Sequence, residues 1–488
     1  MKDIPLFDLN GDIGCGACTT AQYPDAQQLI RKMDYLGIDR TLVSHVEARE
    51  LNPTWGNRKL LAEIAASGGA ERLVPAFTIT PACYYENGTL PFLKGHFQSG
   101  AAGPLCIFPR VANHPVMQLE RMLGELAPFN PVVICNMNGA PDAEISDLAA
   151  LAGCFPGVSF ILTQRMWLGF GSVLDAMWRR ENIHTDISWM HMRDMAARII
   201  REFGAERILF GTGGASHHGA AVAALAHYAI SDVQRELIAH GERLLRLPPL
   251  EQRLTNAPDI LREKPLWRTF RGGKPLAGPK VIDAHAHIGP LTRGWFLGDI
   301  DYPEQTLNML RQMDCLGVQQ MVVSSENALF GNALEGNLLI ERELAAWAPR
   351  LKGYLVFNPR HKDMLIPEFD AFFRRGFFVG FKILSGCWRI PLTSPDYGVV
   401  WEYANAHHLP ILLHTWEGAY DSPALLRDIA PRYPNAKFLL GHAGGGTAGR
   451  SSCGCLVLRG LMGMLLLLVL PYHQVQEGLW MRLQQQQQ

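Results

Sequence analysis

Short apolar runs rich in β-branched and aromatic residues alternate along the chain with longer segments whose apolar positions recur at helical spacing. The short runs include VIDAHAH, QMVVSS, GYLVFN, VGFKIL, PILLH and KFLLGH, and PEQTLNMLRQMDCLG is a helical segment between two of them. Strands that alternate with helices predict right-handed βαβ units and a parallel sheet. The pattern therefore predicts an α/β fold.

The chain repeats itself at an offset near 280 residues. RKMDYLGIDRTLVS at 31–44 matches RQMDCLGVQQMVVS at 311–324 in seven of fourteen positions. The same order of landmarks follows in both halves: FDLNGDIG and IDAHAHIG, RLVPAFTITP and RLKGYLVFNP, PVVIC and PILLH, PGVSFILTQ and PNAKFLLGH. We interpret the chain as a tandem duplication.

The number of strands indicates the architecture of each copy. The first copy adds strands at 182–186 and 207–212, which makes eight βα units in about 240 residues, the size of a (β/α)8 barrel. A doubly wound open sheet is the alternative. We expect two tandem (β/α)8 TIM-barrel domains, the second incomplete at its C-terminus: a barrel at 1–247, a Pro, Gly and Arg-rich linker at 248–279, a barrel at 280–450, and an apolar and Gln-rich tail at 451–488.

Composition narrows the class of partner. Lys plus Arg number 45 against 46 Asp plus Glu, a net charge of -1, which excludes a general nucleic-acid or anionic-membrane binder. The 48% of hydrophobic residues support a large core, and the ten scattered cysteines indicate reduced thiols. The start has no apolar signal region, and LMGMLLLLVL at 461–470 is too short to span a membrane. We expect a cytoplasmic protein with a small-molecule substrate; a homo-oligomer stays open.

Four histidines of the second copy are expected to converge. His285 and His287 are two residues apart on one predicted strand, so their side chains point to the same side. His414 and His442 each end a later strand. In a parallel barrel these C-terminal ends share one mouth, where active sites lie. Neutral imidazoles on rigid strands suit a divalent ion such as Zn²⁺, which polarises carbonyls and activates water.

These motifs resemble the amidohydrolase-related family of metal-dependent hydrolases and decarboxylases, which includes the aminocarboxymuconate-semialdehyde decarboxylase-like enzymes. IDAHAHIG, HTWEG and LLGHAGG carry the resemblance in the second copy, and ILFGTGG with ELIAHGERLLRL in the first. It covers nearly the whole chain, except the linker and the residues after about 450. The resemblance implies that His285, His287 and His414 bind the metal, that His442 is the general acid or base, and that an Asp ending the eighth strand completes the site.

Three further residues are candidates for substrate binding. Lys382 ends the predicted fourth strand and could orient a carboxylate, bridge two metals if carbamylated, or be an ordinary solvated lysine. Arg360, in FNPRH, could bind an acidic substrate or belong to a surface loop. Trp416 lies just past His414 and could line the pocket or pack in a loop.

The first copy lacks the implied ligands. Asn10, Asp12, Cys135 and Gln164 align with His285, His287, His414 and His442, and Gly213 stands where the family has Asp. Such residues do not form a plausible zinc shell. We therefore predict that the first copy binds no catalytic metal and acts as a scaffold.

The second copy lacks the eighth-strand Asp. Gly213 follows Gln164 by 49 residues, so the equivalent after His442 would be position 491, whereas the chain has 488 residues. Either the tail closes the barrel differently, with Glu477, His473, Cys453 or Cys455 as a substitute ligand, or the reading frame fails near position 450, which we favour.

The predicted function is metal-dependent hydrolysis of a small carbonyl or carboxylate substrate in the second copy, with His442 moving the proton. The missing Asp puts activity in doubt. Two alternatives stay open: a metal-dependent decarboxylase, because the same residues could cleave a carbon-carbon bond, and a non-catalytic double-barrel scaffold or ligand-binding protein.

Overall fold

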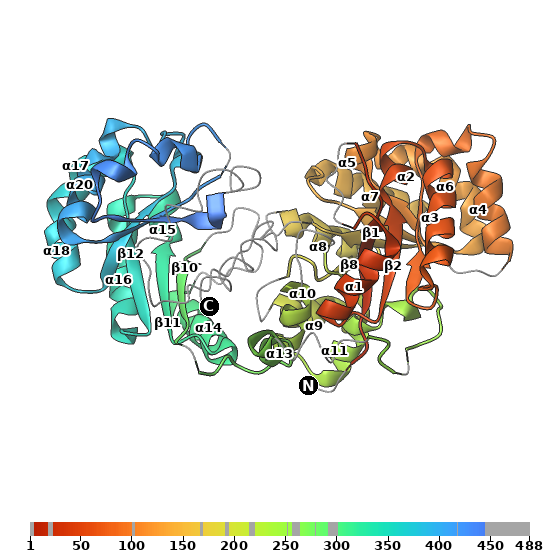
Figure 1. Cartoon of the computed structure of the whole chain (residues 1–488), viewed down its shortest axis with the longest axis horizontal. Helices are drawn as coiled ribbons and strands as arrows, with labels where there is room; N and C mark the ends of the chain where they lie inside the picture. Colours follow the sequence, from red (N-terminus) through yellow and green to blue (C-terminus); the bar gives the residue numbers. More distant parts are fainter. Residues whose placement is uncertain are drawn as a thin grey trace. The chain divides into compact units, whose positions relative to one another are not determined.

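The computed structural model describes residues 4–17, 23–99, 103–165, 169–190, 195–213, 220–250, 252–255, 264–278, 280–290, 301–416 and 418–444. The described residues form two compact units, unit 1 up to Lys274 and unit 2 from Pro275 (Figure 1). The predicted tail, with its apolar run and candidate substitute ligands, lies outside the described residues. Among the helices of the described ranges, none has the length and hydropathy of a membrane span.

Unit 1 is built on parallel strands that pair in the order of the sequence. They are β1 (Phe7–Ile13), β2 (Arg40–His45), β3 (Leu73–Pro75), β4 (Phe77–Thr78), β5 (Leu105–Ile107), β6 (Val132–Asn136), β7 (Ser159–Thr163), β8 (Ile183–Asp186) and β9 (Ile208–Leu209). The short strands β3 and β4 are separated only by Ala76; β3 pairs with β2 and β4 pairs with β5. Together they therefore count as one strand position. The described strands thus fill the eight positions predicted for a barrel.

Helices cover the outside of these strands (Figure 1). They are α1 (Ala26–Leu36), α2 (Val46–Glu50), α3 (Pro53–Ser67), α4 (Thr89–Gln98), α5 (Pro109–Ala112), α6 (Glu120–Leu126), α7 (Asp142–Cys154), α8 (Phe170–Arg179), α9 (Met195–Phe203), α10 (Ala220–His227), α11 (Asp232–Ala239) and α13 (Pro265–Arg271). Alternate strand residues form two separate cores. Val133 packs toward the helices, whereas Leu42 and Ile134 pack in the barrel interior.

Side chains connect the first and last strand positions of unit 1. Asp8 on β1 accepts hydrogen bonds from the Thr212 backbone N–H at 2.8 Å and from Thr212 Oγ1 at 2.7 Å. Further along both segments, the Gly213 N–H donates to Asn10 Oδ1 at 2.7 Å. Among the described residues, β1 and β9 do not pair through a backbone ladder. The side-chain bonds of Asp8 and Asn10 connect these two strand positions instead.

The described part of unit 2 is an open, parallel sheet whose six strands also follow the order of the sequence. They are β10 (Ile282–Ile288), β11 (Gln320–Ser325), β12 (Leu351–Val356), β13 (Phe378–Ile383), β14 (Pro410–Leu413) and β15 (Lys437–Leu440). The helices are α14 (Tyr302–Leu316), α15 (Glu326–Phe330), α16 (Ala333–Leu344), α17 (Lys362–Leu365), α18 (Phe369–Arg374), α19 (Ser385–Trp388) and α20 (Gly398–His407). The curved face of the sheet encloses a small core that includes Val322, Tyr354 and Leu412. Unit 2 is thus described as a half-barrel.

The same local structures recur at the aligned positions of the two units. Gly37 ends α1 with φ 73° and Gly317 ends α14 with φ 77°, a left-handed conformation that glycine adopts without strain. The pairing of β1 with β2 shifts register after Asp8, and that of β10 with β11 shifts after Asp283. Each first strand therefore bends at the same point.

A buried asparagine ties a helix to the third strand position in each unit. The Asn57 side chain exchanges two hydrogen bonds of 2.9 Å with the backbone of Thr78. The Asn337 side chain makes the equivalent pair with the backbone of Val356, at 2.9 and 3.0 Å. Both asparagines are fully buried, where an unmade bond would cost about 1–3 kcal/mol.

The boundary between the units lies later than the predicted start of the linker at 248. Arg253, inside the predicted linker, forms an ion pair of 2.8 Å with the buried carboxylate of Asp39 in unit 1. The helix α13 belongs to unit 1 as well, since His227 Nε2 lies 2.8 Å from the carbonyl of Phe270. Composition alone did not reveal these contacts, because Arg and Pro are as compatible with a packed segment as with a linker.

Candidate active site

The four predicted histidines of unit 2 lie together at the C-terminal ends of the strands. His285 and His287 project from β10, His414 directly follows β14, and His442 follows β15. The ring of His285 lies 5.3 Å from that of His287 and 5.1 Å from that of His442, centre to centre. The rings of His414 and His442 are 4.8 Å apart. The convergence expected from the strand positions is present in the structure.

Two carboxylates support this cluster from behind. Glu326, the first residue of α15, has Oε1 at 3.4 Å from His287 Nδ1. Asp421 has Oδ2 at 3.1 Å from His414 Nδ1. A carboxylate at Nδ1 fixes the orientation of an imidazole and leaves Nε2 available to a ligand. The sequence analysis missed both residues. Glu326 had one usable signal, its position directly after the apolar run of β11.

Lys382 lies inside the cluster. Its side chain is fully buried at the end of β13, and Nζ is 3.1 Å from His285 Nε2. Burial lowers the pKa of the Lys382 ammonium to about 7 and raises the pKa of the Glu326 carboxyl to about 7. Lys382 is therefore not a solvated surface lysine, which was one of the alternatives; it is a buried amine beside a histidine.

The surroundings of the histidines favour the neutral form of the imidazole. Burial lowers the pKa of His285 well below its usual value, and burial also lowers the pKa of His442 to about 3. The cationic neighbour Lys382 adds to the effect on both. A neutral imidazole is the form that binds metal ions and accepts protons.

The other two candidates differ in their positions. The Trp416 ring lies 5.8 Å from that of His442, so this residue belongs to the cluster. Arg360 is exposed, and its Nη2 donates to the Trp388 carbonyl at 2.8 Å. The structure thus brings Trp416 to the site and places Arg360 at the surface, on the loop after β12.

Imidazole nitrogens are suitable ligands for a divalent ion, but in this structure the described side chains are not arranged around a common metal position. Within the described ranges, no three His, Cys, Asp or Glu side chains stand together as a complete set of metal ligands. The Lys382 amine lies at the Nε2 atom that His285 would offer, so metal binding requires that Nζ move away. The eighth-strand position lies outside the described residues.

In unit 1 the aligned positions line a cavity, with one correction. Asn10, Asp12, Gln164 and Gly213 line it, whereas Cys135 is fully buried on the helix side of β6. Strand pairing shows why the alignment was wrong by one residue: Cys135 is opposite Leu162 on β7, and Leu413 is opposite Leu440 on β15. Asn136 is therefore the equivalent of His414.

Comparison with known proteins gives a family for part of the chain. The family model described as amidohydrolase matches residues 282–454, the segment with the four histidines. Comparison with curated proteins gives no match.

Solved structures are similar over about half of the chain. One is 2,6-dihydroxybenzoate decarboxylase complexed with 2,6-dihydroxybenzoate, with 16% identity, a TM-score of 0.40, and coverage of 50% of this chain and 100% of that one. A putative amidohydrolase from Staphylococcus aureus has 12% identity, a TM-score of 0.40 and the same coverage. Dihydroxybenzoic acid decarboxylase from Polaromonas, with bound manganese, has 14% identity, a TM-score of 0.39, and coverage of 50% and 97%. Within the chain, it is the segment 282–454, which contains the strands β10 to β15 and the four histidines, that matches the amidohydrolase family.

Proposed function

We propose that unit 2 is a metal-dependent enzyme that hydrolyses a small carbonyl or carboxylate compound. The observation that carries the proposal is the convergence of four imidazoles at the C-terminal ends of parallel strands, with carboxylates behind two of them. A mainly structural cluster would not need neutral, oriented imidazoles in one mouth.

His285, His287 and His414 are the proposed metal ligands, and Zn²⁺ is the proposed ion. The ion would supply Lewis-acid polarisation of the substrate carbonyl and acidify water. Glu326 and Asp421 orient two of the three imidazoles.

The remaining groups act on the substrate and its proton. His442 is the proposed general acid or base; burial lowers its pKa to about 3, so it would enter the reaction as the neutral imidazole. The Trp416 ring lies 5.8 Å from that of His442 in an edge-to-face arrangement and would line the pocket beside it. The Lys382 amine would orient a substrate carboxylate, and Arg360 would contact it only at the rim.

Metal content tests the proposal directly. The full chain, purified without chelator, should contain close to one divalent ion per chain, measured by elemental mass spectrometry. The double substitution His285→Ala with His414→Ala should abolish binding, whereas His407→Ala, an exposed histidine of α20, should not. Fewer than about 0.2 ions per chain in folded protein would refute the enzyme and favour the non-catalytic scaffold. Product analysis then separates hydrolysis from decarboxylation, for which the same residues would serve.

We also propose that the chain arose by tandem duplication and that both copies share the (β/α)8 barrel plan. The recurring asparagine bonds, glycine caps and register shifts support a common origin, since they lie at aligned positions. Partial proteolysis of the full chain should release two fragments separated near Lys274. A single resistant core would contradict two independent copies.

A further inference from the structure

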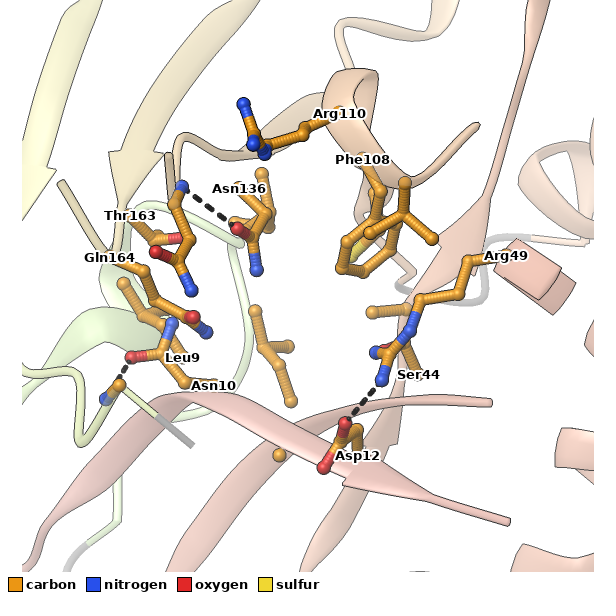
Figure 2. A pocket seen from close by; sticks show the side chains of 18 of the residues that line it. Leu9, Asn10, Asp12, Ser44, Arg49, Phe108, Arg110, Asn136, Thr163 and Gln164 are labelled. Atoms are coloured by element: carbon orange, nitrogen blue, oxygen red, sulfur yellow. Dashed lines mark hydrogen bonds and ion pairs between the residues drawn. The ribbon is translucent and has the colours of Figure 1, made fainter. Parts of the chain in front are cut away.

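Unit 1 has a cavity of about 520 Å³ at the C-terminal ends of its strands (Figure 2). Apolar residues of the barrel interior form part of its wall: Leu9, Leu42, Ala76 and Ile134. Polar side chains face the space from opposite sides, with Asn10, Asn136 and Gln164 on one side and Arg49 with Asp12 on the other. A volume of this size is typical of small-molecule sites.

The cavity occupies the position of the histidine cluster but has a different chemistry. Asn10, Asn136 and Gln164 stand at the positions of His285, His414 and His442. Gln164 and His442 even share the same backbone conformation, with φ of 58° and 56°. Carboxamides are poor ligands for zinc but have N–H groups that donate to an oxygen anion. Unit 1 thus has carboxamide groups at the positions where unit 2 has three of its imidazoles.

Two guanidinium groups are present in unit 1 at positions where unit 2 has none. Arg49 on α2 aligns with Leu329, and Arg110 on α5 aligns with Gly386. Both arginines line the cavity. Arginine presents a planar fork that matches a carboxylate and stays charged at any pH of interest. The substitutions have therefore introduced positive charge into a cavity that opens to solvent.

Arg49 is held in place. Its side chain is only 9% exposed, its Nη2 forms an ion pair of 2.9 Å with Asp12, and its guanidinium lies 5.1 Å from the centre of the Phe108 ring. Arg110 is exposed at the rim, where Nη1 donates to the Gly139 carbonyl at 2.8 Å. Asp12 offsets one of the two positive charges, which leaves a net positive cavity.

We propose that the cavity of unit 1 binds a small organic carboxylate with an apolar body, without a metal. The carboxylate binds Arg110 at the rim, with carboxamides beside it, and the apolar body lies against the barrel interior. Asp12 already pairs with the Arg49 guanidinium, so a ligand carboxylate would compete with Asp12 for it. Unit 1 is thus a ligand-binding domain rather than an inert scaffold.

Benzoate is a suitable probe, measured by calorimetric titration of the full chain. Arg110→Gln, at the exposed rim, should weaken benzoate binding by about 10-fold or more, because a charge-assisted hydrogen bond is lost. Arg179→Gln, an exposed arginine of unit 1 paired with Asp175, is the matched control and should change nothing. Asp12→Asn should strengthen binding severalfold, because it frees the Arg49 guanidinium for the ligand.

The opposite signs of the two cavity substitutions distinguish binding from a structural role. A loss of stability could weaken binding in both variants, but it would not strengthen it in Asp12→Asn. Benzamide, which has the same ring and no charge, should bind at least about 10-fold more weakly than benzoate. Absence of benzoate binding at about 10 mM, equal binding of benzamide, or unchanged affinity in Arg110→Gln would each overturn the proposal.

Binding in unit 2 is separated by a further variant. His442→Ala in the full chain should leave the Arg110-dependent binding intact. If His442→Ala abolishes all benzoate binding and Arg110→Gln does not alter it, the ligand binds in unit 2 and the proposal is wrong. Failure of metal binding by unit 2 would leave the titration unaffected, so the two proposals are refuted by different results.

Discussion

Replacement of Asp186 by asparagine should change how the stability of unit 1 depends on pH. Asp186 ends β8 and is only 2% exposed. Its Oδ1 accepts from Ser188 Oγ at 2.8 Å, whereas Oδ2 is buried and has no hydrogen-bond partner among the described residues. Burial raises the pKa of this carboxyl from 3.8 to about 7. The folded protein therefore keeps a proton that the unfolded chain releases in acid.

The sign and size of the effect follow from this difference. Below about pH 4 both states are protonated, and the carboxyl costs nothing. As the pH rises from about 4 to about 7, the unfolded state binds fewer protons than the folded state, so the free energy of unfolding falls. The difference between 3.8 and about 7, at roughly 1.4 kcal/mol per pH unit, corresponds to about 4 kcal/mol. A carboxamide at this position has no proton to release and escapes this loss.

Denaturant unfolding of the full chain at several pH values measures the effect. Asp186→Asn should be close to the wild type near pH 4 and more stable by about 2–4 kcal/mol near pH 8. Asp175→Asn, at an exposed position of α8, is the control and should follow the wild type. The charge of Asp8, whose own pKa burial raises to about 6, also raises the pKa of Asp186, so the difference between Asp186→Asn and the wild type includes the interaction of this pair. If Asp186→Asn shows the same pH dependence as the wild type, the buried-acid reasoning is refuted.

Two other substitutions give independent outcomes. Gly211→Ala should destabilise unit 1 by about 1–3 kcal/mol in thermal or denaturant unfolding, because the added Cβ would lie 2.5 Å from Asn10 Oδ1 and still closer to a second buried oxygen; unaltered stability would mean that the strand end can shift freely. Asp421→Asn should weaken metal binding by about 10–100-fold in competition with a chelator, because His414 loses the carboxylate that orients it. Asp428→Asn, at an exposed position nearby, should not, and equal effects of the two would remove Asp421 from the site.

The sequence was sufficient to predict those features of the fold and the site that depend on the periodicity of strands and helices. Two residues on one strand point the same way, and the ends of parallel strands meet, so the convergence of His285 with His442 followed from spacing alone. The same reasoning could have avoided the error at Cys135. Ile134 and Asn136 share a face that Cys135 does not, and a check of alternation along VVICN would have shown it.

Contacts made by loops and helix starts could not be predicted in this way. Asp421 reaches His414 from seven positions further along the chain, a contact that no periodic pattern specifies. The burial of Lys382 depends on how neighbouring strands and helices pack around it, so the local sequence does not determine its exposure. Likewise, the contact of Arg253 with Asp39 joins residues more than 200 positions apart, and neither residue type indicates the other.

The bonds between Asp8 and Thr212 place a limit on the order in which unit 1 can assemble. They join residues 204 positions apart, and together with the bond from Gly213 to Asn10 they connect the two ends of the strand ring. During synthesis, β1 is made long before the segment that contains Thr212, so the Asp8 carboxylate has no Thr212 to bind until that segment is complete. The ring can therefore close only after almost all of unit 1 has been made, which makes closure a late event with a high loop-entropy cost.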